Sequence, residues 1–89
     1  MNTTDQITVR VRYFAGARAA AEVTEETVRL PQGATVHQVL SLLADRRGAR
    51  LERVLGACSF LVDGVAVTDR DRRLTTPVVL DVLPPFAGG

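Results

Sequence analysis

The chain has 89 residues, of which 46% are hydrophobic and 24% charged, and its net charge is +1. This length predicts a single domain with one modest core, and it excludes a second domain. The eleven arginines are interspersed with ten acidic residues, which does not favour nucleic-acid binding. No apolar run approaches the roughly 18 residues of a membrane span, and the polar start is unlike a signal peptide. We therefore expect a cytoplasmic protein, and a single cysteine that cannot form an internal disulfide agrees with a reducing compartment.

Lysine is absent, because all eleven basic residues are arginines. The chain consequently has no side-chain amine that could accept an acyl group from an activated carboxyl terminus. If its own carboxylate were activated, the protein could not modify its own lysines.

Two strands are predicted in the first third of the chain. Residues 7–14 alternate apolar and polar side chains until the last two, which is typical of a half-buried strand. Residues 15–22 break this alternation and predict a loop with a helical turn. A second strand is predicted over residues 23–30, ended by the turn residues 31–33. The side chains predicted to face the core are Ile7, Val9, Val11, Tyr13, Val28 and Leu30.

The next segment predicts a helix with well-marked ends. Thr35 is the expected N-cap, Gln38 stands three residues later as its capping-box partner, and Gly48 is placed to end the helix. Apolar residues at helical spacing form a stripe that should pack on a sheet. Its members are Val36, Val39, Leu40 and Leu43. A second short helical turn is predicted around residues 51–55, closed by Gly56.

The remainder predicts three strands. Residues 58–62 read as a strand, and Asp63-Gly64 is a strong hairpin signal that leads into residues 65–67. Residues 69–73 form a mixed-charge loop, for which a solvated loop and a partner-recognition role both stay open. The last strand is predicted over residues 78–83. Its alternation places Leu80 and Val82 on one face, with Asp81 outside and Leu83 as an exposed apolar residue on the other.

This order of elements predicts an α+β fold of the β-grasp, ubiquitin-like kind. A hairpin, a helix lying across the sheet and then further strands would give a mixed sheet of 4–5 strands with one main helix packed across it. In this arrangement the first and last strands pair in parallel at the centre. Whatever follows the last strand then leaves from the middle of a rigid sheet.

Residues with chemically useful side chains do not form a catalytic set. Cys58 lacks a neighbouring acid, base or second cysteine and alternates with Phe60 and Val62, which indicates a buried structural thiol. His37 has no partner at metal-ligand spacing, so an exposed helix histidine is expected and no metal site is predicted. The chain therefore has no predicted catalytic machinery of its own.

The last six residues, 84–89, are predicted to be an extended, flexible tail. Pro84 and Pro85 favour an extended backbone without sheet hydrogen bonds, so the tail can project for up to roughly 20 Å. Gly88 and Gly89 could thread a narrow tunnel, although a frayed terminus of accidental composition is the alternative. A terminal carboxylate becomes reactive only when it is activated, usually by adenylyl transfer from ATP. The mixed anhydride could then be captured by an amine, giving a protein modifier, or by a sulfur donor, giving a thiocarboxylate.

Two segments carry a resemblance to a known family. Residues 14–18, Phe-Ala-Gly-Ala-Arg, resemble the F-A-x-x-R stretch of the molybdopterin synthase small-subunit (MoaD) family, and residues 83–89 resemble its P-P-x-x-G-G ending. The chain is identified on this basis as a member of the MoaD/ThiS ubiquitin-like sulfur carriers. It departs from the usual pattern at residues 76–78, Thr-Pro-Val, where the family often has Asp-Gly-Asp, and by an extra residue between Asp63 and Leu74.

The resemblance implies a sulfur carrier with no bound cofactor. An E1-like adenylyltransferase would activate the tail with ATP, and the molybdopterin synthase large subunit would accept the sulfur in a complex of two small with two large subunits. Gly89 would hold the thiocarboxylate, Gly88 would allow passage through a tunnel, and Phe86 with Leu83 would pack against partners. The full set of implied partner-binding residues is Leu83, Pro84, Pro85, Phe86, Ala87 and Gly88. Sulfur carriers for cysteine or thiamine synthesis, a ubiquitin-like modifier and a simple binding module remain alternatives.

Overall fold

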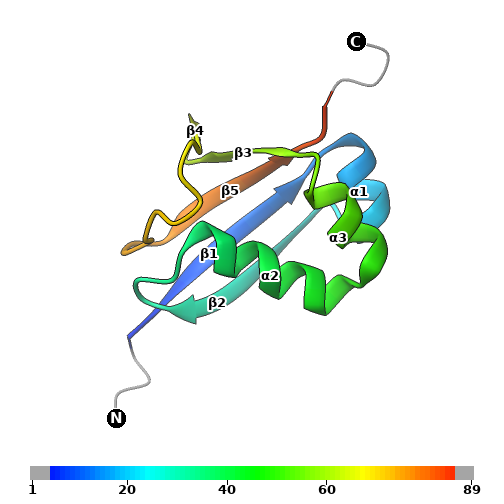
Figure 1. Cartoon of the computed structure of the whole chain (residues 1–89). Coiled ribbons are helices and arrows are strands. Elements are labelled where there is room, and N and C mark those ends of the chain that lie inside the picture. Colours follow the sequence, from blue (N-terminus) through cyan, green and yellow to red (C-terminus); the bar gives the residue numbers. More distant parts are fainter. Residues whose placement is uncertain (1–4, 86–89) are drawn as a thin grey trace.

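The computed structural model describes residues 5–85 of the chain. A mixed sheet of five strands has the order β2-β1-β5-β3-β4, and α2 and α3 lie against one of its faces (Figure 1). The predicted α+β, β-grasp arrangement is confirmed. In chain order the elements are β1 (Gln6–Tyr13), α1 (Ala15–Ala21), β2 (Glu25–Pro31), α2 (Val36–Arg47), α3 (Ala49–Leu55), β3 (Ser59–Val62), β4 (Val65–Ala66) and β5 (Val78–Leu83).

The centre of the sheet is the parallel pair of β1 and β5, as predicted. Val9 lies opposite Val78, and Tyr13 lies opposite Val82. Alternate residues of β1 are fully buried, which is the period expected for a strand with one face on a core. The inward side chains of β1, β2, β3 and β5 meet those of α2 in one hydrophobic core. Strand β5 is hydrogen-bonded on both sides and is therefore held firmly at the middle of the fold.

Helix α2 has the predicted ends. The Thr35 hydroxyl accepts a hydrogen bond from the Gln38 backbone N–H at 3.1 Å, and the Gln38 side-chain oxygen accepts one from the Thr35 N–H at 2.8 Å. This capping box satisfies donors that the first turn would otherwise leave unpaired. At the other end, the N–H of Gly48 donates to the Ala44 carbonyl at 2.8 Å. Gly48 has φ of 102°, a conformation that glycine adopts readily.

The structure corrects the boundaries of several segments. Residues 15–21 form the seven-residue helix α1, not a loop with a single turn. Alanine is the best helix former, and Ala17, Ala20 and Ala21 are buried at helical spacing. The helix is therefore longer than the single turn predicted from the break in alternation. The second strand begins at Glu25, two residues later than predicted, because Glu22 takes a left-handed conformation that ends α1. Strand β4 is limited to Val65 and Ala66.

The Asp63-Gly64 turn has the predicted hairpin geometry. Asp63 and Gly64 have φ of 50° and 83°, and positive φ at both central residues is what a type I′ turn requires.

The charged loop over residues 69–73 contacts the start of α2 through its backbone. The Arg70 carbonyl accepts a hydrogen bond from the His37 N–H at 2.9 Å. The Arg72 carbonyl accepts one from the Val36 N–H at 3.3 Å. The loop therefore closes the amino-terminal end of α2.

One half-buried carboxylate, Glu26, links four elements. It accepts hydrogen bonds from the Tyr13 hydroxyl at 2.6 Å, from Arg46 Nη1 at 3.1 Å, and from Arg47 Nε and Nη2 at 3.1 and 2.9 Å. Arg47 also donates to the Ala21 carbonyl at 3.4 Å. Glu26 thus joins β2 to β1, to the end of α2 and, through Arg47, to α1.

None of the helices within residues 5–85 is long and apolar enough to cross a membrane.

Candidate functional site at the end of the central strand

The candidate site begins where β5 ends. Within the strand, Leu80 and Val82 are buried against the helices, and the Val82 carbonyl accepts a hydrogen bond from the Phe14 N–H at 3.2 Å. After Leu83 the chain leaves the sheet, and Figure 1 shows it departing at the end of the molecule where α1 lies. Pro84 is half-buried and Pro85 is exposed. The predicted site residues Phe86, Ala87, Gly88 and Gly89 lie outside the described residues.

Leu83 is less exposed than predicted. It lies on the sheet face opposite the helices, as its alternation required, but it is half-buried, not exposed. Leu83 pairs with Ser59 of β3 in the antiparallel ladder, so a neighbouring strand shields part of the side chain. An apolar side chain that is partly open at the base of the tail remains available to a partner.

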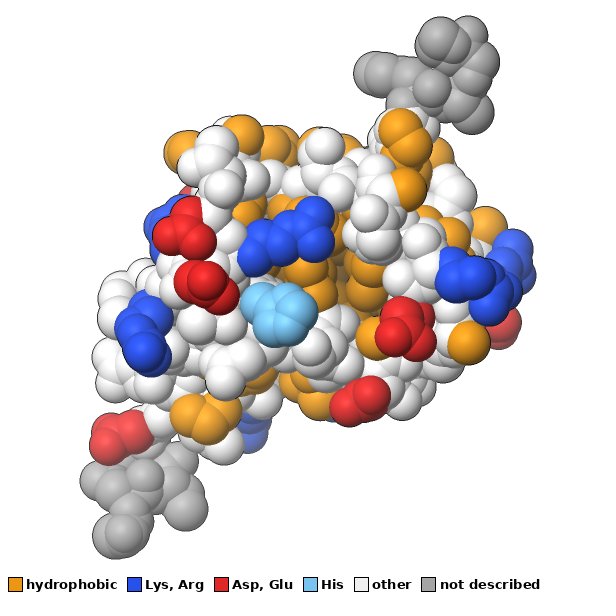
Figure 2. Space-filling view, in the orientation of Figure 1, with side chains coloured by type: hydrophobic (Ala, Val, Ile, Leu, Met, Phe, Trp, Pro, Cys, Tyr) orange, Lys and Arg blue, Asp and Glu red, His pale blue; other side chains and the backbone are white. Residues whose placement is uncertain are grey.

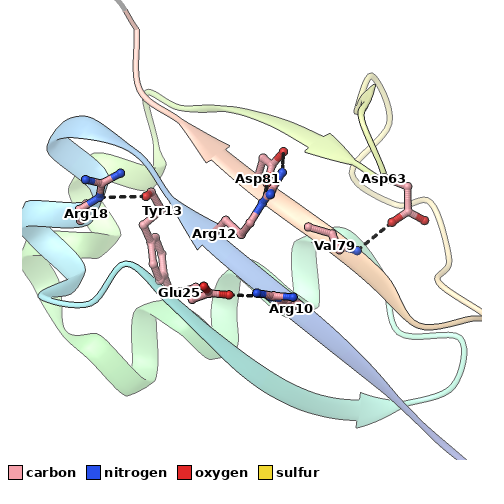
Figure 3. Close-up of polar contacts among 8 residues, drawn as sticks. All are labelled: Arg10, Arg12, Tyr13, Arg18, Glu25, Asp63, Val79 and Asp81. Atoms are coloured by element: carbon pink, nitrogen blue, oxygen red, sulfur yellow. Dashed lines mark hydrogen bonds and ion pairs between the residues drawn. The ribbon is translucent and has the colours of Figure 1, made fainter.

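Asp81 corrects a second prediction. Its face is the predicted one, but the residue is only 6% exposed, and it is the one charged residue classed as buried within residues 5–85. Arg12 of β1 covers it, with Nε 2.6 Å from Oδ1 and Nη2 2.9 Å from Oδ2 (Figure 3). This hydrogen bonding, together with the charge of Asp81, raises the pKa of Arg12. The pair was not predicted, although the two residues are register partners in the parallel pair of β1 and β5.

The sheet face opposite the helices, called the open face below, has a charged half and an apolar half. Arg10 of β1 forms an ion pair with Glu25 of β2 at 2.5 Å on this face (Figure 3). On the β5 and β3 side, Val79, Leu83 and Leu61 are half-buried. The open-face side chains are Thr8, Arg10, Arg12, Glu25, Thr27, Arg29, Ser59, Leu61, Val79, Asp81 and Leu83. A surface of this kind can bind a protein that offers apolar side chains to one half and charged side chains to the other.

Two segments singled out in the sequence lie side by side. Residues 14–18 follow β1 directly, and the Phe14 N–H is hydrogen-bonded to β5 one residue before Leu83. Arg12 lies over the Phe14 ring, 5.9 Å from its centroid, and Arg18 Nε donates to the Tyr13 carbonyl at 3.3 Å. The Phe14–Arg18 segment is therefore part of the base from which the tail emerges.

Cys58, the single cysteine, is a buried structural residue, as predicted. Cys58 is 5% exposed, and its thiol donates to the Val54 carbonyl at 3.2 Å. Burial raises the pKa of the Cys58 thiol, which opposes formation of the reactive thiolate. His37 is exposed on α2, also as predicted. Within residues 5–85, no group of three acidic, histidine or cysteine side chains could hold a metal ion.

A shallow groove of about 230 Å³ lies on the other side of the molecule, between α2, α3 and the 69–73 loop. Leu40 and Leu55 line it, with His37, Arg70 and Glu52 among the polar lining residues. Figure 2 shows apolar surface in this region surrounded by charges of both signs. Arg70 is held over the Phe60 ring, 4.8 Å from its centroid, so it already has a partner within the fold. Among the described residues, the histidine and acidic side chains of this groove form no group that could hold a metal ion.

These features define a class of protein. A β-grasp sheet holds the central strand β5 between two neighbouring strands, and the chain leaves that strand beside the open face. This is the organisation of a ubiquitin-like domain.

The comparisons identify the family within that class. Residues 11–89 match the model of the ThiS family, and the chain belongs to that family. It is 30% identical over 82 residues to the molybdopterin synthase sulfur carrier subunit of Chlamydomonas reinhardtii, covering 91% of this chain and 98% of the relative.

Solved structures agree with this assignment. A putative molybdopterin converting factor subunit 1 from Pyrococcus furiosus is 28% identical, with a TM-score of 0.76 over 90% of this chain and 99% of its own. Small archaeal modifier protein 1 from Methanosarcina acetivorans is 25% identical, with a TM-score of 0.77 over 94% and 98%. A complex of subunits 1 and 2 of the Helicobacter pylori molybdopterin-converting factor has a TM-score of 0.65 over 93% of this chain and 100% of its own, and at 22% identity it shows the fold alone.

Proposed function

We propose that this protein is a sulfur carrier for the synthesis of the dithiolene group of molybdopterin. The observation that carries the proposal is the family match, which extends to the Gly-Gly end at residue 89. The tail follows β5, the central strand, which is hydrogen-bonded to a neighbouring strand on each side. The relative with 30% identity is named as the sulfur carrier subunit of molybdopterin synthase, which favours this acceptor over the cysteine and thiamine pathways.

The chemistry resides in the terminal carboxylate of Gly89. An E1-like partner transfers the adenylyl group of ATP to this carboxylate, and pyrophosphate leaves. Hydrosulfide supplied by a sulfur donor then attacks the acyl carbon, the carbon–oxygen bond to AMP breaks, and the thiocarboxylate forms with AMP as the leaving group. ATP is a substrate of the partner and not a cofactor held by this chain.

The other tail residues serve delivery. Pro84 and Pro85 keep the first part of the tail extended, and Gly88 lets the end pass through a narrow tunnel in the molybdopterin synthase large subunit. Phe86 and Leu83 supply apolar contacts to both partners, with the open face of the sheet behind them. Two carriers are consumed for each dithiolene, in an assembly of two small and two large subunits.

Activation can be measured by exchange of labelled pyrophosphate into ATP in the presence of the E1-like enzyme. We expect exchange with the full chain and none after deletion of Gly89. Val65→Glu, at an exposed position on β4 away from the tail, is the control and should retain exchange. Exchange that persists without Gly89 would contradict activation at this carboxylate.

The acceptor is tested separately. Thiocarboxylated protein, mixed with the molybdopterin synthase large subunit and its cyclic pyranopterin precursor, should form dithiolene. Formation of cysteine or of the thiamine thiazole by the corresponding enzymes, without dithiolene, would assign the carrier to one of those pathways instead.

A protein modifier is the second candidate, and the likeness to a small archaeal modifier protein favours it. A modifier would appear in cells as adducts on lysines of other proteins. Because this chain has no lysine, such adducts could not be extended into chains through its own side chains. Adducts that disappear on deletion of Gly89, together with no thiocarboxylate, would support this second function.

A further inference from the structure

The edge of the sheet formed by β2 has no neighbour within residues 5–85. Strand β2 (Glu25–Pro31) pairs only with β1, and Figure 1 shows it along one margin of the sheet, with β4 at the other. An unpaired strand of seven residues presents a row of backbone donors and acceptors that a further strand can use.

The hydrogen-bonding pattern identifies the groups that point outward. The Thr24 carbonyl accepts a bond from the Tyr13 N–H at 2.9 Å, and the Gln32 N–H donates to the Asp5 carbonyl at 2.9 Å. Residues with backbone groups directed at β1 alternate with residues directed away from it. The even-numbered residues of β2 therefore bond to β1, and the N–H and C=O groups of Glu25, Thr27 and Arg29 face outward.

The side chains of these three residues lie on the open face, because Val28 and Leu30, which alternate with them along the strand, are buried in the core. Glu25 carries a negative charge, Arg29 a positive charge, and Thr27 lies midway. Within residues 5–85 Arg29 makes no ion pair, whereas Glu25 has a partner only in the exposed Arg10. When two copies of this strand run antiparallel with Thr27 aligned, the negative residue of one copy lies opposite the positive residue of the other.

We propose that this edge pairs antiparallel with the β2 edge of a second copy, about a two-fold axis at Thr27. Thr27 then lies opposite Thr27 of the other copy, and Glu25 lies opposite Arg29 in both directions. Each of these pairs would exchange two backbone hydrogen bonds, and the opposite charges would be neighbours on the open face. Moving the axis to Glu25 or to Arg29 would bring like charges together, so the charges select one register.

The proposed dimer is closed and leaves the tails accessible. Antiparallel pairing of β2 uses this edge in both copies, and the opposite edge, β4, is only two residues long. Strands β1 and β5 run parallel to each other, so reversal of β2 between copies directs the two tails to opposite ends of the continuous sheet. Both open faces lie on one side of that sheet. This inference is independent of the chemistry at Gly89.

The test is a charge-swap series measured by sedimentation velocity across a concentration range. We expect the wild-type chain to dimerise as concentration rises, and Glu25→Arg or Arg29→Glu each to weaken dimerisation about tenfold, because two symmetry-related pairs become repulsive. The double variant Glu25→Arg/Arg29→Glu restores opposite pairing and should recover most of the lost affinity. Arg50→Glu on α3 makes the same charge change away from the edge and should have no such effect.

Amide hydrogen exchange on the unaltered protein supplies a second readout. Protection of the Glu25, Thr27 and Arg29 amides should rise with protein concentration, while the amides of Glu26 and Val28 are protected at all concentrations. A chain that stays monomeric at every concentration it tolerates, or a dimer unaffected by Arg29→Glu, would overturn the proposal. Protection of the edge amides only when another protein is added would also overturn it and would assign the edge to that protein.

Discussion

Replacing Glu26 with alanine should destabilise the fold more than the loss of any exposed carboxylate. The Glu26 side chain is 8% exposed and accepts hydrogen bonds from Tyr13, Arg46 and Arg47. Its removal leaves the Tyr13 hydroxyl buried and takes the partner from Arg47, whose side chain is 25% exposed. Breaking a buried pair costs about 3–5 kcal/mol, and the partial exposure of both arginines places this site near 3 kcal/mol. For a domain of this size, such a loss lowers Tm by about 12–24 °C.

Thermal and urea unfolding followed by circular dichroism would measure this loss. Glu25→Ala is the matched control, because Glu25 is the adjacent residue but its side chain is 45% exposed, and it should cause a much smaller loss. If Glu26→Ala destabilises the protein no more than Glu25→Ala does, the network does not join the elements as described.

The same residue gives the protein a pH dependence. Burial alone would raise the pKa of Glu26, but hydrogen bonds from Arg47, Tyr13 and Arg46 outweigh it and hold the pKa below its usual range. A lowered pKa in the folded state stabilises the protein above the unfolded pKa of about 4.3, and this contribution is lost as pH falls through the folded pKa. The difference in unfolding free energy between the wild type and Glu26→Ala should therefore shrink as pH falls below about 4. An unchanged difference would contradict ionisation of Glu26.

Thr35→Ala removes the acceptor for the Gln38 N–H and should lower the free energy of unfolding by about 1 kcal/mol in urea titrations; an unchanged midpoint would exclude the cap as a contributor. Cys58 should react with an alkylating reagent far more slowly in the native protein than in urea, and equal rates would show that the thiol is accessible. Leu83→Glu should weaken binding to the activating enzyme in calorimetry, whereas Val65→Glu, at an exposed position on β4, should not. Equal effects of these two changes would remove Leu83 from the interface.

The features predicted from sequence are those with local causes. The alternation of β1, the capping box of Thr35 and Gln38 and the Asp63-Gly64 turn are each encoded within a few residues, and each is found. The β-grasp topology followed from the order of these elements. Helix α1 was underestimated because its signal is composition, several alanines, and not a hydrophobic period.

The polar contacts could not be predicted because they depend on register between distant strands. Arg12 and Asp81 are 69 positions apart and meet only because β1 and β5 pair in parallel. Asp81 was placed outside on the ground that a lone carboxylate prefers water, and the guanidinium that covers it reverses that preference. Glu26 was not singled out because the four hydrogen bonds that it accepts come from β1 and from the far end of α2.

The candidate site divides in the same way. Its tail was predicted from composition and from the family resemblance, while the contacts at its base were not. The adjacency of Phe14 to the end of β5, the cover of Asp81 by Arg12 and the half-burial of Leu83 all come from strand pairing. Gly89 as the reactive residue therefore stays a prediction from sequence, and the structure describes the surface at the base of the tail.

The intact mass of the protein, recovered from cells that also supply its activating enzyme, tests the central claim most directly. A sulfur carrier gains the mass difference between sulfur and oxygen, and the gain disappears when Gly89 is deleted. An unchanged mass accompanied by adducts on other proteins would contradict the carrier function in favour of a modifier. An unchanged mass without adducts would leave a β-grasp binding domain whose terminal glycine is never activated.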